Sequence, residues 1–197
     1  MSGIVAIVDA LTQVAARVTR QNRLLVAASS QPQSITQALF GEAFIITTGS
    51  VNLTTDAVSH LLYIKNNERI NWVIESLTGT FGATDGSGDG FAQFTIGPSA
   101  GTLVSGGTDI VPANLNFGSP NRLTGVFKVG GTGSTITDGI SAAPTLVPAG
   151  LTSREFPAQP LVIAPGSSFA IGFQPPTGNT SMNVQIQVPV YREVIEQ

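Results

Sequence analysis

The spacing of apolar residues changes near residue 45 of this chain. Between residues 4 and 25, apolar residues recur at alternating three- and four-residue steps, which is the pattern of one helix face. From residue 44 onward they alternate with polar residues, as along 184–190, which is the pattern of a strand with one buried face. The sequence therefore predicts an N-terminal helical stem followed by a β-body, the arrangement of a protein that attaches by one end and displays the other.

The helical stem is expected over residues 4–28. Its heptad a and d positions are apolar apart from one asparagine, and they hold Ile4, Val8, Leu11, Ala15, Val18, Asn22 and Leu25. An Asn at an a position sets the register and oligomeric state of coiled coils. These seven residues form the predicted oligomerisation and anchoring interface. Because three heptads are the lower limit for a coiled coil, the alternative is an amphipathic helix packed on its own β-body.

Three segments are expected along the chain. The stem spans 1–31 and ends before Pro32, because proline cannot continue a helix. A joint follows at 32–43, where Ser34 as N-cap and Gly41 as terminator are typical of a short helix. The β-body takes up the remaining residues, 44–197.

The body is expected to be mainly β, an antiparallel two-sheet jelly-roll sandwich carrying the N-terminal helical stem. Strands are predicted at 43–48, 51–54, 60–65, 71–77, 91–96, 102–104, 125–129, 161–163, 168–173 and 183–191. The stretch 130–160 is rich in small residues and poor in strand signal. It is expected to be a crossing connection or an interaction loop, and many short strands with long connections favour the jelly roll.

Composition removes several classes of function. Charged residues make up 11% of the chain, against about 25% for ordinary domains, so many polar surfaces could be buried against neighbouring subunits. Cysteine is absent, which excludes thiol catalysis and thiolate metal sites. The net charge is −3 and the body has no basic stripe, so nucleic acid is not an expected partner. No signal peptide and no apolar run long enough to span a membrane are recognisable, so no membrane partner is expected either.

Two features of the sequence are candidates for a metal or catalytic site. His60 is the only histidine, and one histidine without cysteine cannot build the usual zinc site, so it is interpreted as a structural or surface residue. Asp85 and Asp89 flank a glycine-rich string that could hold a hard cation such as calcium. Two carboxylates make a weak site, so the loop is interpreted as a mobile hairpin tip and no metal site is assigned.

No enzyme is predicted. Most of the 12 acidic residues lie near predicted turns, and Glu75 is the only one within a well-defined predicted strand. Trp72, Tyr63 and Tyr191 could stack on sugars, although an aromatic residue in an alternating strand more often belongs to a core. No catalytic residue and no cofactor is assigned.

Four strings of the body are similar to a group of tailed-bacteriophage virion proteins: Leu62-Tyr63-Ile64-Lys65-Asn66-Asn67-Glu68, Asn116-Phe117-Gly118-Ser119, Thr137-Asp138-Gly139 and Pro175-Pro176-Thr177-Gly178-Asn179-Thr180-Ser181-Met182-Asn183-Val184. The resemblance covers about residues 40–192. In that group a short N-terminal helix precedes a jelly-roll body, and there are no catalytic or cofactor residues. The resemblance implies a structural role on the particle.

The function expected from this resemblance is that of a non-enzymatic virion structural protein. The first hypothesis is a capsid decoration (cement) or head-associated protein, a homotrimer bound to the major capsid protein through its N-terminal stem. The alternative is a tail or fibre component that acts as a receptor- or carbohydrate-binding module. In either case the protein is expected in the virion, assembled in the host cytoplasm.

Overall fold

The computed structural model describes residues 6–8, 15–18, 24–26, 33–97, 107–141, 145–156 and 160–193, with side chains described from Ile35 onward except at 96, 97 and 141. The chain divides into two compact units, residues 1–36 and 37–197.

The described residues between 6 and 26 form a small antiparallel sheet. Its three strands lie in the order β1-β2-β3: β1 (Ala6–Val8), β2 (Ala15–Val18) and β3 (Leu24–Val26). Ala6 pairs with Arg17, and Ala16 pairs with Val26. The helical stem expected over 4–28 is therefore not confirmed at the described residues. Runs such as Ile-Val-Ala-Ile-Val fit the helical spacing, but their β-branched residues also favour strands.

The expected anchoring interface falls partly on these strands. Val8, Ala15, Val18 and Leu25 belong to β1, β2 and β3. The other three seam residues, Ile4, Leu11 and Asn22, lie outside the described residues. The role of these seven residues as an anchoring interface stays a prediction.

A short helix, α1 (Gln33–Leu39), occupies the joint where the sequence predicts one. Gly41 follows it with a φ of 72°, the left-handed conformation that commonly ends a helix, and its N–H donates to the Ala38 carbonyl at 3.0 Å. The Ala38 side chain packs against a small outer cluster of Ala43, Val73 and Tyr191. The helix is thus fixed on the strands that it precedes.

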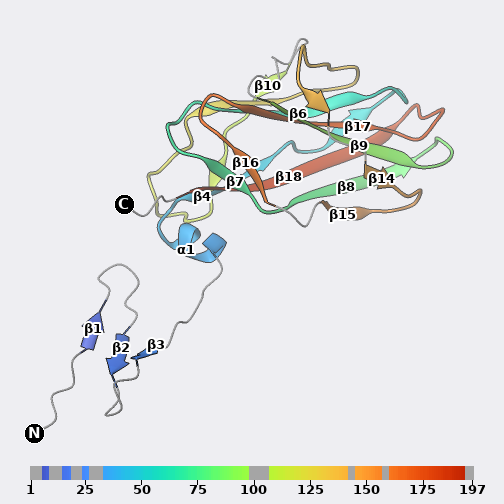
Figure 1. The fold of residues 1–197 in the computed structure, drawn as a ribbon. Coiled ribbons are helices and arrows are strands. Elements are labelled where there is room, and N and C mark those ends of the chain that lie inside the picture. Colours follow the sequence, from blue (N-terminus) through green and yellow to red (C-terminus); the bar gives the residue numbers. More distant parts are fainter. Residues whose placement is uncertain are drawn as a thin grey trace, which may run out of the picture. The chain divides into compact units, whose positions relative to one another are not determined.

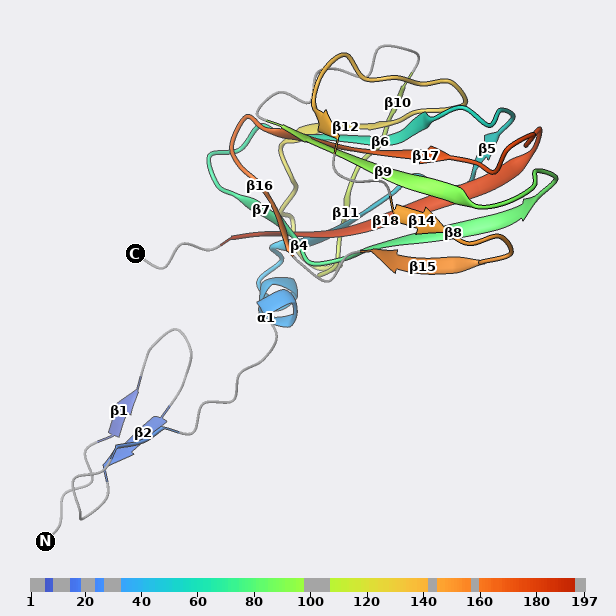
Figure 2. The ribbon, with the colours of Figure 1, turned by 45° about the vertical axis from the view of Figure 1, so that its right-hand side comes forward.

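The body consists of two antiparallel sheets that face each other (Figure 1, Figure 2). The eight-strand sheet contains β4 (Ala43–Thr47), β5 (Val51–Leu53), β7 (Trp72–Ile74), β8 (Leu77–Thr84), β11 (Ala113–Asn114), β15 (Ser153–Phe156), β16 (Leu161–Ile163) and β18 (Met182–Arg192). The seven-strand sheet contains β6 (Ser59–Asn66), β9 (Gly90–Gly97), β10 (Thr108–Asp109), β12 (Gly125–Val129), β13 (Ile140–Ser141), β14 (Thr145–Val147) and β17 (Ser168–Gln174). The expected two-sheet β-body is confirmed.

The strands pair in a nested order. The last strand, β18, pairs with β4 and β5, while β17 pairs with β6. Inside these, β16 and β15 pair with β7 and β8, and the innermost pairs join β13 and β14 to β9. Within the body, the first strands therefore pair with the last strand and the next strand with the next-to-last one, as in one long hairpin wrapped across two sheets. β12, with β10 beside it, adds to the outer edge of β6.

The core fills the space between the two sheets. Along β18 every second residue faces inward, and Val184, Ile186, Val188 and Val190 are all at most 2% exposed. This is the alternation that the sequence predicts at 183–191. Two expectations were wrong. The predicted strand 71–77 is two strands, β7 and β8, and the stretch 130–160 is not free of strands, because it contains β13, β14 and β15. The strand predicted at 102–104 lies outside the described residues.

Candidate functional site

One end of the body is built where the loop 115–124 lies against the connection between α1 and β4. Asn114 donates from Nδ2 to the Gly41 carbonyl at 2.9 Å, and Asn116 donates from Nδ2 to the Leu39 carbonyl at 3.0 Å. The Leu115 N–H donates to the Ala43 carbonyl at 2.9 Å. Asparagine suits these positions, because its short amide can bond to backbone groups in a turn. The loop and the helix end therefore form one hydrogen-bonded unit.

A charged cluster, here called the Arg192 clamp, holds this end together. Arg192 binds Glu68 through two hydrogen bonds, and its Nη1 donates to Glu42 Oε2 at 2.6 Å. Asn121 donates from Nδ2 to Glu42 Oε1 at 2.7 Å. Arg192 belongs to β18, Glu68 to the turn after β6, Glu42 to the residue just before β4, and Asn121 to the loop. The clamp therefore ties together four segments that are far apart in the sequence.

The clamp keeps the Glu68 carboxylate charged. Burial alone would raise the pKa of Glu68, but hydrogen bonds from Arg192, from Trp72 Nε1 and from the Thr124 N–H outweigh burial and hold that pKa below its usual value. The hydrogen bonds to Glu68 in turn raise the pKa of Arg192. Because each charge has its partner inside the protein, the clamp is a stabilising device and leaves no acid or base free for catalysis.

Large hydrophobic side chains project from the same end into solvent. Leu39 and Phe40 at the end of α1 are 67% and 62% exposed, and Phe117 on the loop is 95% exposed. Leu115 beside them is 41% exposed. We call Leu39, Phe40, Leu115 and Phe117 the joint surface. A cluster of exposed hydrophobic residues on a hydrogen-bonded frame is typical of a protein–protein contact.

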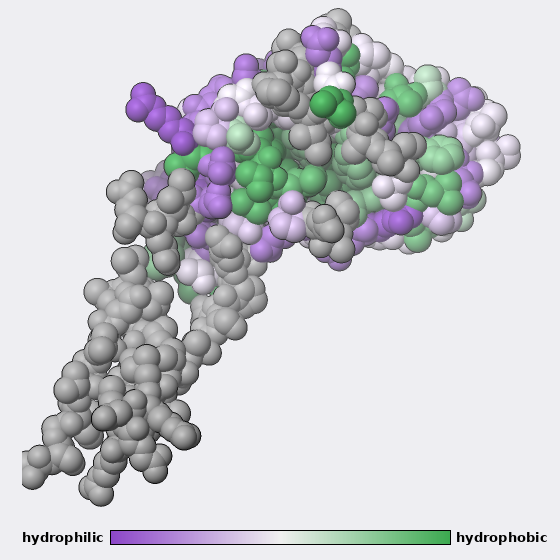
Figure 3. Space-filling model, in the orientation of Figure 1, coloured by the Kyte–Doolittle hydropathy of each residue, from purple (hydrophilic) through white to green (hydrophobic). Residues whose placement is uncertain are grey.

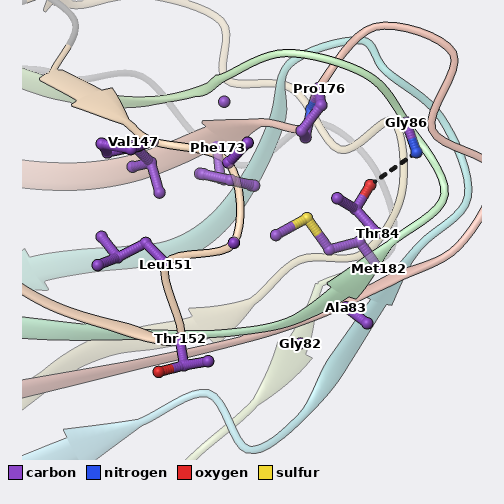
Figure 4. A pocket seen from close by; sticks show the side chains of 14 residues that line it. Gly82, Ala83, Thr84, Gly86, Val147, Leu151, Thr152, Phe173, Pro176 and Met182 are labelled. Atoms are coloured by element: carbon purple, nitrogen blue, oxygen red, sulfur yellow. Dashed lines mark hydrogen bonds between the residues drawn. The ribbon is translucent and has the colours of Figure 1, made fainter.

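The opposite end of β18 borders a cavity of about 430 Å³ (Figure 4). Its wall consists of Phe173, Met182, Val147 and Leu151, and its rim consists of small residues such as Gly86. The one side-chain hydrogen bond drawn there joins the Gly86 N–H to Thr84 Oγ1 at 3.0 Å. None of the described residues that line this cavity has an ionisable side chain. The cavity therefore offers space but no group for acid–base chemistry.

His60 has the structural position that the sequence suggests. It lies on β6, half-buried, with Nδ1 3.3 Å from the Ser134 carbonyl oxygen. Burial lowers its pKa, and the contact with Ser134 only partly opposes this. The ring is therefore neutral at pH 7, with Nδ1–H donating to the carbonyl and Nε2 left as an acceptor.

The loop 85–90 is held by hydrogen bonds, unlike the mobile hairpin tip that the sequence suggests. Asp85 Oδ1 accepts from the Thr180 and Ser181 N–H groups at 2.8 and 3.2 Å, and Oδ2 accepts from the Thr180 hydroxyl. The bonds from Thr180 lower the pKa of Asp85 to about 2. Asp89 Oδ1 accepts from the Ala149 N–H at 2.9 Å. Both carboxylates thus fasten neighbouring loops.

The three aromatic residues considered for sugar stacking are buried. Trp72 is 0% exposed and stacks on Phe127 with ring centroids 5.6 Å apart, and Tyr63 is 2% exposed. Tyr191 is 6% exposed and donates from its hydroxyl to Glu75 Oε1 at 3.0 Å. Burial, followed by that bond, raises the pKa of Tyr191 to about 12. Glu75 lies in the break between β7 and β8, not within a strand as expected.

Sequence reasoning missed the joint surface. Phe117 stands in the turn Asn116-Phe117-Gly118-Ser119, where a large aromatic between turn-forming residues has no neighbour to complete an apolar face. That isolation is the signal that could have been used, because an aromatic in a tight turn has little chance of reaching a core. The exposed Leu39 and Phe40 gave no comparable signal, since they fit the apolar face of a short helix.

Neither a metal-binding cluster nor a membrane-spanning helix occurs among the described residues. No group of three or more histidine, cysteine, aspartate or glutamate side chains there could hold a metal ion. No described helix is long and apolar enough to cross a membrane. Comparison of the chain with protein-family models, with curated proteins and with solved structures finds no match.

Proposed function

We propose that this chain is a non-enzymatic structural protein of a bacteriophage particle, a capsid decoration (cement) or other head-associated protein. The joint surface is the observation that carries the proposal. Leu39, Phe40 and Phe117 are large hydrophobic residues of the kind that a stable contact buries, and all three are more than 60% exposed. Attachment through this surface leaves the rest of the body displayed.

The proposed fold of the body is a jelly roll. The nested pairing supports it, because pairing of first with last and second with next-to-last strands produces two interlocked Greek keys across two sheets. Jelly rolls are a recurrent architecture of viral capsid domains. The four strings that resemble tailed-phage virion proteins fall largely on corners of this fold, including Glu68 of the clamp and Asn116 of the loop.

A structural role also agrees with how the polar groups are used. The Arg192 clamp and the Asp85 bonds join segments of the body to one another, and the 430 Å³ cavity is lined by apolar and small residues. The short edge strands β10, β11 and β13, each of two residues, limit open-ended sheet pairing. Contacts through side chains are therefore the proposed mode of assembly, with copies of the chain as a homotrimer and with the major capsid protein.

Incorporation into purified particles tests the proposal. A variant lacking residues 1–31, and a Leu39→Ser/Phe117→Ser double variant of the full chain, are both expected to fold and to be lost from particles. Ile140→Ser is the matched control, because Ile140 is 73% exposed but lies on β13. Wild-type incorporation of the double variant, judged by gel densitometry against the major capsid band, would contradict attachment through the joint surface.

The same gel tests a second candidate function, that of a tail or fibre component that binds a receptor or carbohydrate. One observation favours it: a hollow of about 340 Å³ lined by Val58, Phe91, Gln93 and Gln174 at the seven-strand sheet. Copy number is the discriminating quantity. Hundreds of copies per particle mean decoration, whereas a few tens or fewer mean a fibre or tail position.

A further inference from the structure

The string Thr137-Asp138-Gly139 contains one of three Asp-Gly pairs in this chain, and the others are Asp85-Gly86 and Asp89-Gly90. An aspartate followed by glycine is the arrangement in which the main chain most readily attacks its own side chain, because glycine has no side chain to obstruct its backbone nitrogen. The sequence contains no Asn-Gly pair, so these three pairs are its candidates for this reaction. Their surroundings differ in the folded protein.

In the first pair, both reacting groups are engaged by hydrogen bonds. Asp85 accepts bonds from the Thr180 and Ser181 N–H groups and from the Thr180 hydroxyl. The Gly86 N–H donates to Thr84 Oγ1 at 3.0 Å. The bonds from Thr180 lower the pKa of Asp85 to about 2, so its carboxyl stays ionised and is a poor target for a nucleophile. This pair is therefore protected from reaction.

The second pair is held by the sheet. Asp89 Oδ1 accepts from the Ala149 N–H at 2.9 Å, and Gly90 begins β9, where it is buried and pairs with Val147 of β14. A Cβ placed on Gly90 would lie 2.8 Å from Phe173 Cζ, so the backbone there is packed against that ring. Attack by the Gly90 nitrogen would require a peptide unit to turn within this packing. The second pair is protected as well.

The third pair has neither kind of protection. Asp138 and Gly139 are both exposed, and Gly139 has a φ of 135°, a conformation that favours glycine. Within the described part of the chain, no hydrogen bond or ion pair engages the Asp138 carboxylate. The segment between β12 and β13 runs along the surface at the top of the body in Figure 1, where Figure 3 shows hydrophilic and hydrophobic residues mixed. The Asp138 side chain is therefore free to turn toward the Gly139 nitrogen.

We propose that Asp138 is a site of spontaneous isomerisation to isoaspartate. The Gly139 nitrogen attacks Cγ of the neutral Asp138 carboxyl, an N–C bond forms, and a C–O bond breaks. The oxygen leaves as water with one hydrogen from the nitrogen and one from the carboxyl, and a five-membered succinimide remains. Water then adds to the main-chain carbonyl carbon of this ring and opens it, which leaves the chain running through Cγ as isoaspartate. One water leaves and one returns, so the reaction needs no co-reactant.

The main chain is anchored on both sides of this pair. Ile136 packs with Tyr63 and Ala170, and Ile140 of β13 pairs with Ile96 of β9. Isoaspartate lengthens the main chain between these anchors by one carbon atom. Because β13 has only two residues, the change falls where it can release this strand from β9. The inference does not rest on the proposed function, since it concerns the chemistry of this loop and not the joint surface.

The test follows isoaspartate at all three pairs in the full chain, kept folded near neutral pH at physiological temperature for several weeks. A parallel sample is kept in denaturant. Both are digested in mildly acidic solution, which suppresses the reaction during digestion, and isoaspartate is assigned by electron-transfer fragmentation in the mass spectrometer. In the folded chain we expect it to form at Asp138 about tenfold faster than at Asp85 or Asp89, because loss of one hydrogen bond to a carboxylate raises a barrier by that much or more.

In denaturant the three rates should approach one another, because the protecting bonds are absent. Equal rates at the three pairs of the folded chain, or no isoaspartate at Asp138, would overturn the proposal. A difference that persists unchanged in denaturant would also contradict it, since local sequence would then set the rates.

Three variants sharpen the test. Asp138→Glu should abolish the product at this position, because glutamate would have to close a six-membered ring, which forms much more slowly. Thr180→Val removes the hydroxyl that bonds Asp85 and should raise isoaspartate formation at Asp85 several-fold. Thr177→Val is the matched control in the same loop, because Thr177 bonds Ser87 through its backbone. An unchanged rate at Asp85 in Thr180→Val, or an equal rise in Thr177→Val, would contradict the protection on which the choice of Asp138 depends.

Discussion

Arg192 and Glu68 meet through two parallel hydrogen bonds, from Nε to Oε2 at 2.8 Å and from Nη2 to Oε1 at 2.5 Å. Their side chains are only 15% and 10% exposed, so the pair is largely removed from water. Loss of the Glu68 charge would leave Arg192 with Glu42 as its remaining carboxylate partner and would weaken the bonds that Glu68 accepts from Arg192, Trp72 and the Thr124 N–H. This pair joins the last strand to the turn after β6 and thereby positions the loop that carries Phe117.

Glu68→Gln is therefore expected to lower the free energy of unfolding by about 1.5–3 kcal/mol, the range for hydrogen bonds to a charged group, because Arg192 keeps its bond to Glu42. Asp109→Asn is the matched control. Asp109 bonds Lys128 at 3.1 Å, but its side chain is 82% exposed, so its loss should cost less than about 1 kcal/mol. Chemical denaturation of the three proteins measures the difference. Similar losses for the two variants would contradict the role given to the clamp.

The stability contributed by Glu68 should depend on pH in a defined direction. Its pKa in the folded protein is below the unfolded value of about 4.3, so the unfolded state binds more protons as the solution becomes acidic. The contribution is complete above that unfolded pKa and is lost as pH falls through the folded pKa. The stability gap between wild type and Glu68→Gln should thus be constant from about pH 6 to 8 and shrink below about pH 4. A stability difference between the two proteins that increases below pH 4 would contradict a lowered pKa of Glu68 in the folded protein.

The main features of the body could be predicted from the sequence where one physical requirement dominates. Alternation along 184–190 forces one face inward, and β18 has this pattern with Val184, Ile186, Val188 and Val190 buried. The boundaries of β12 and β16 also agree with the sequence prediction. Which strands pair could not be predicted, because residues such as Ile186 and Thr48 meet across a sequence separation of more than 100 residues.

The strands of the N-terminal unit and the Arg192 clamp could not be predicted from the sequence, for two different reasons. Between residues 4 and 25 the same residues satisfy helical spacing and contain β-branched runs, so local pattern does not decide between helix and the strands β1–β3. The Arg192 clamp brings together residues from four segments that are far apart in the sequence. Whether these side chains meet depends on which strands pair. The spacing of Glu42, Glu68 and Arg192 along the sequence gives no sign of their contact.

The inward and outward positions of β18 should differ sharply in stability. Ile186 is 2% exposed, so Ile186→Ala should lower the free energy of unfolding by about 2–5 kcal/mol through loss of buried surface and the cavity left behind. Gln185 faces away from the core and makes only a long bond of 3.3 Å to Thr47 Oγ1, so Gln185→Ala should cost less than about 0.5 kcal/mol. Denaturant titration compares them, and equal costs would mean that the facing of β18 is misassigned.

Gly125 should be intolerant of any side chain. A Cβ at this position would lie 2.4 Å from the Lys65 carbonyl oxygen and 2.5 Å from Trp72 Cη2, and the Lys65 backbone is fixed in β6. Gly125→Ala should therefore cost about 1–3 kcal/mol or more through overpacking. Gly131→Ala is the control, because a Cβ there meets nothing within 4 Å, and it should be neutral or slightly stabilising. Melting curves of the two variants that coincide would contradict the close approach of β12 to Trp72.

The Asp85–Asp89 loop should not respond to calcium. Both oxygens of Asp85 already accept hydrogen bonds from Thr180, and Asp89 accepts one from the Ala149 N–H, so a cation that requires six to eight oxygens would have to displace them. A site of micromolar affinity at millimolar calcium would add about 4 kcal/mol of stability. We therefore expect the same melting temperature in millimolar calcium and in chelator. A rise of several degrees with calcium that disappears in an Asp85→Asn/Asp89→Asn double variant would show that these carboxylates release their backbone partners to bind metal.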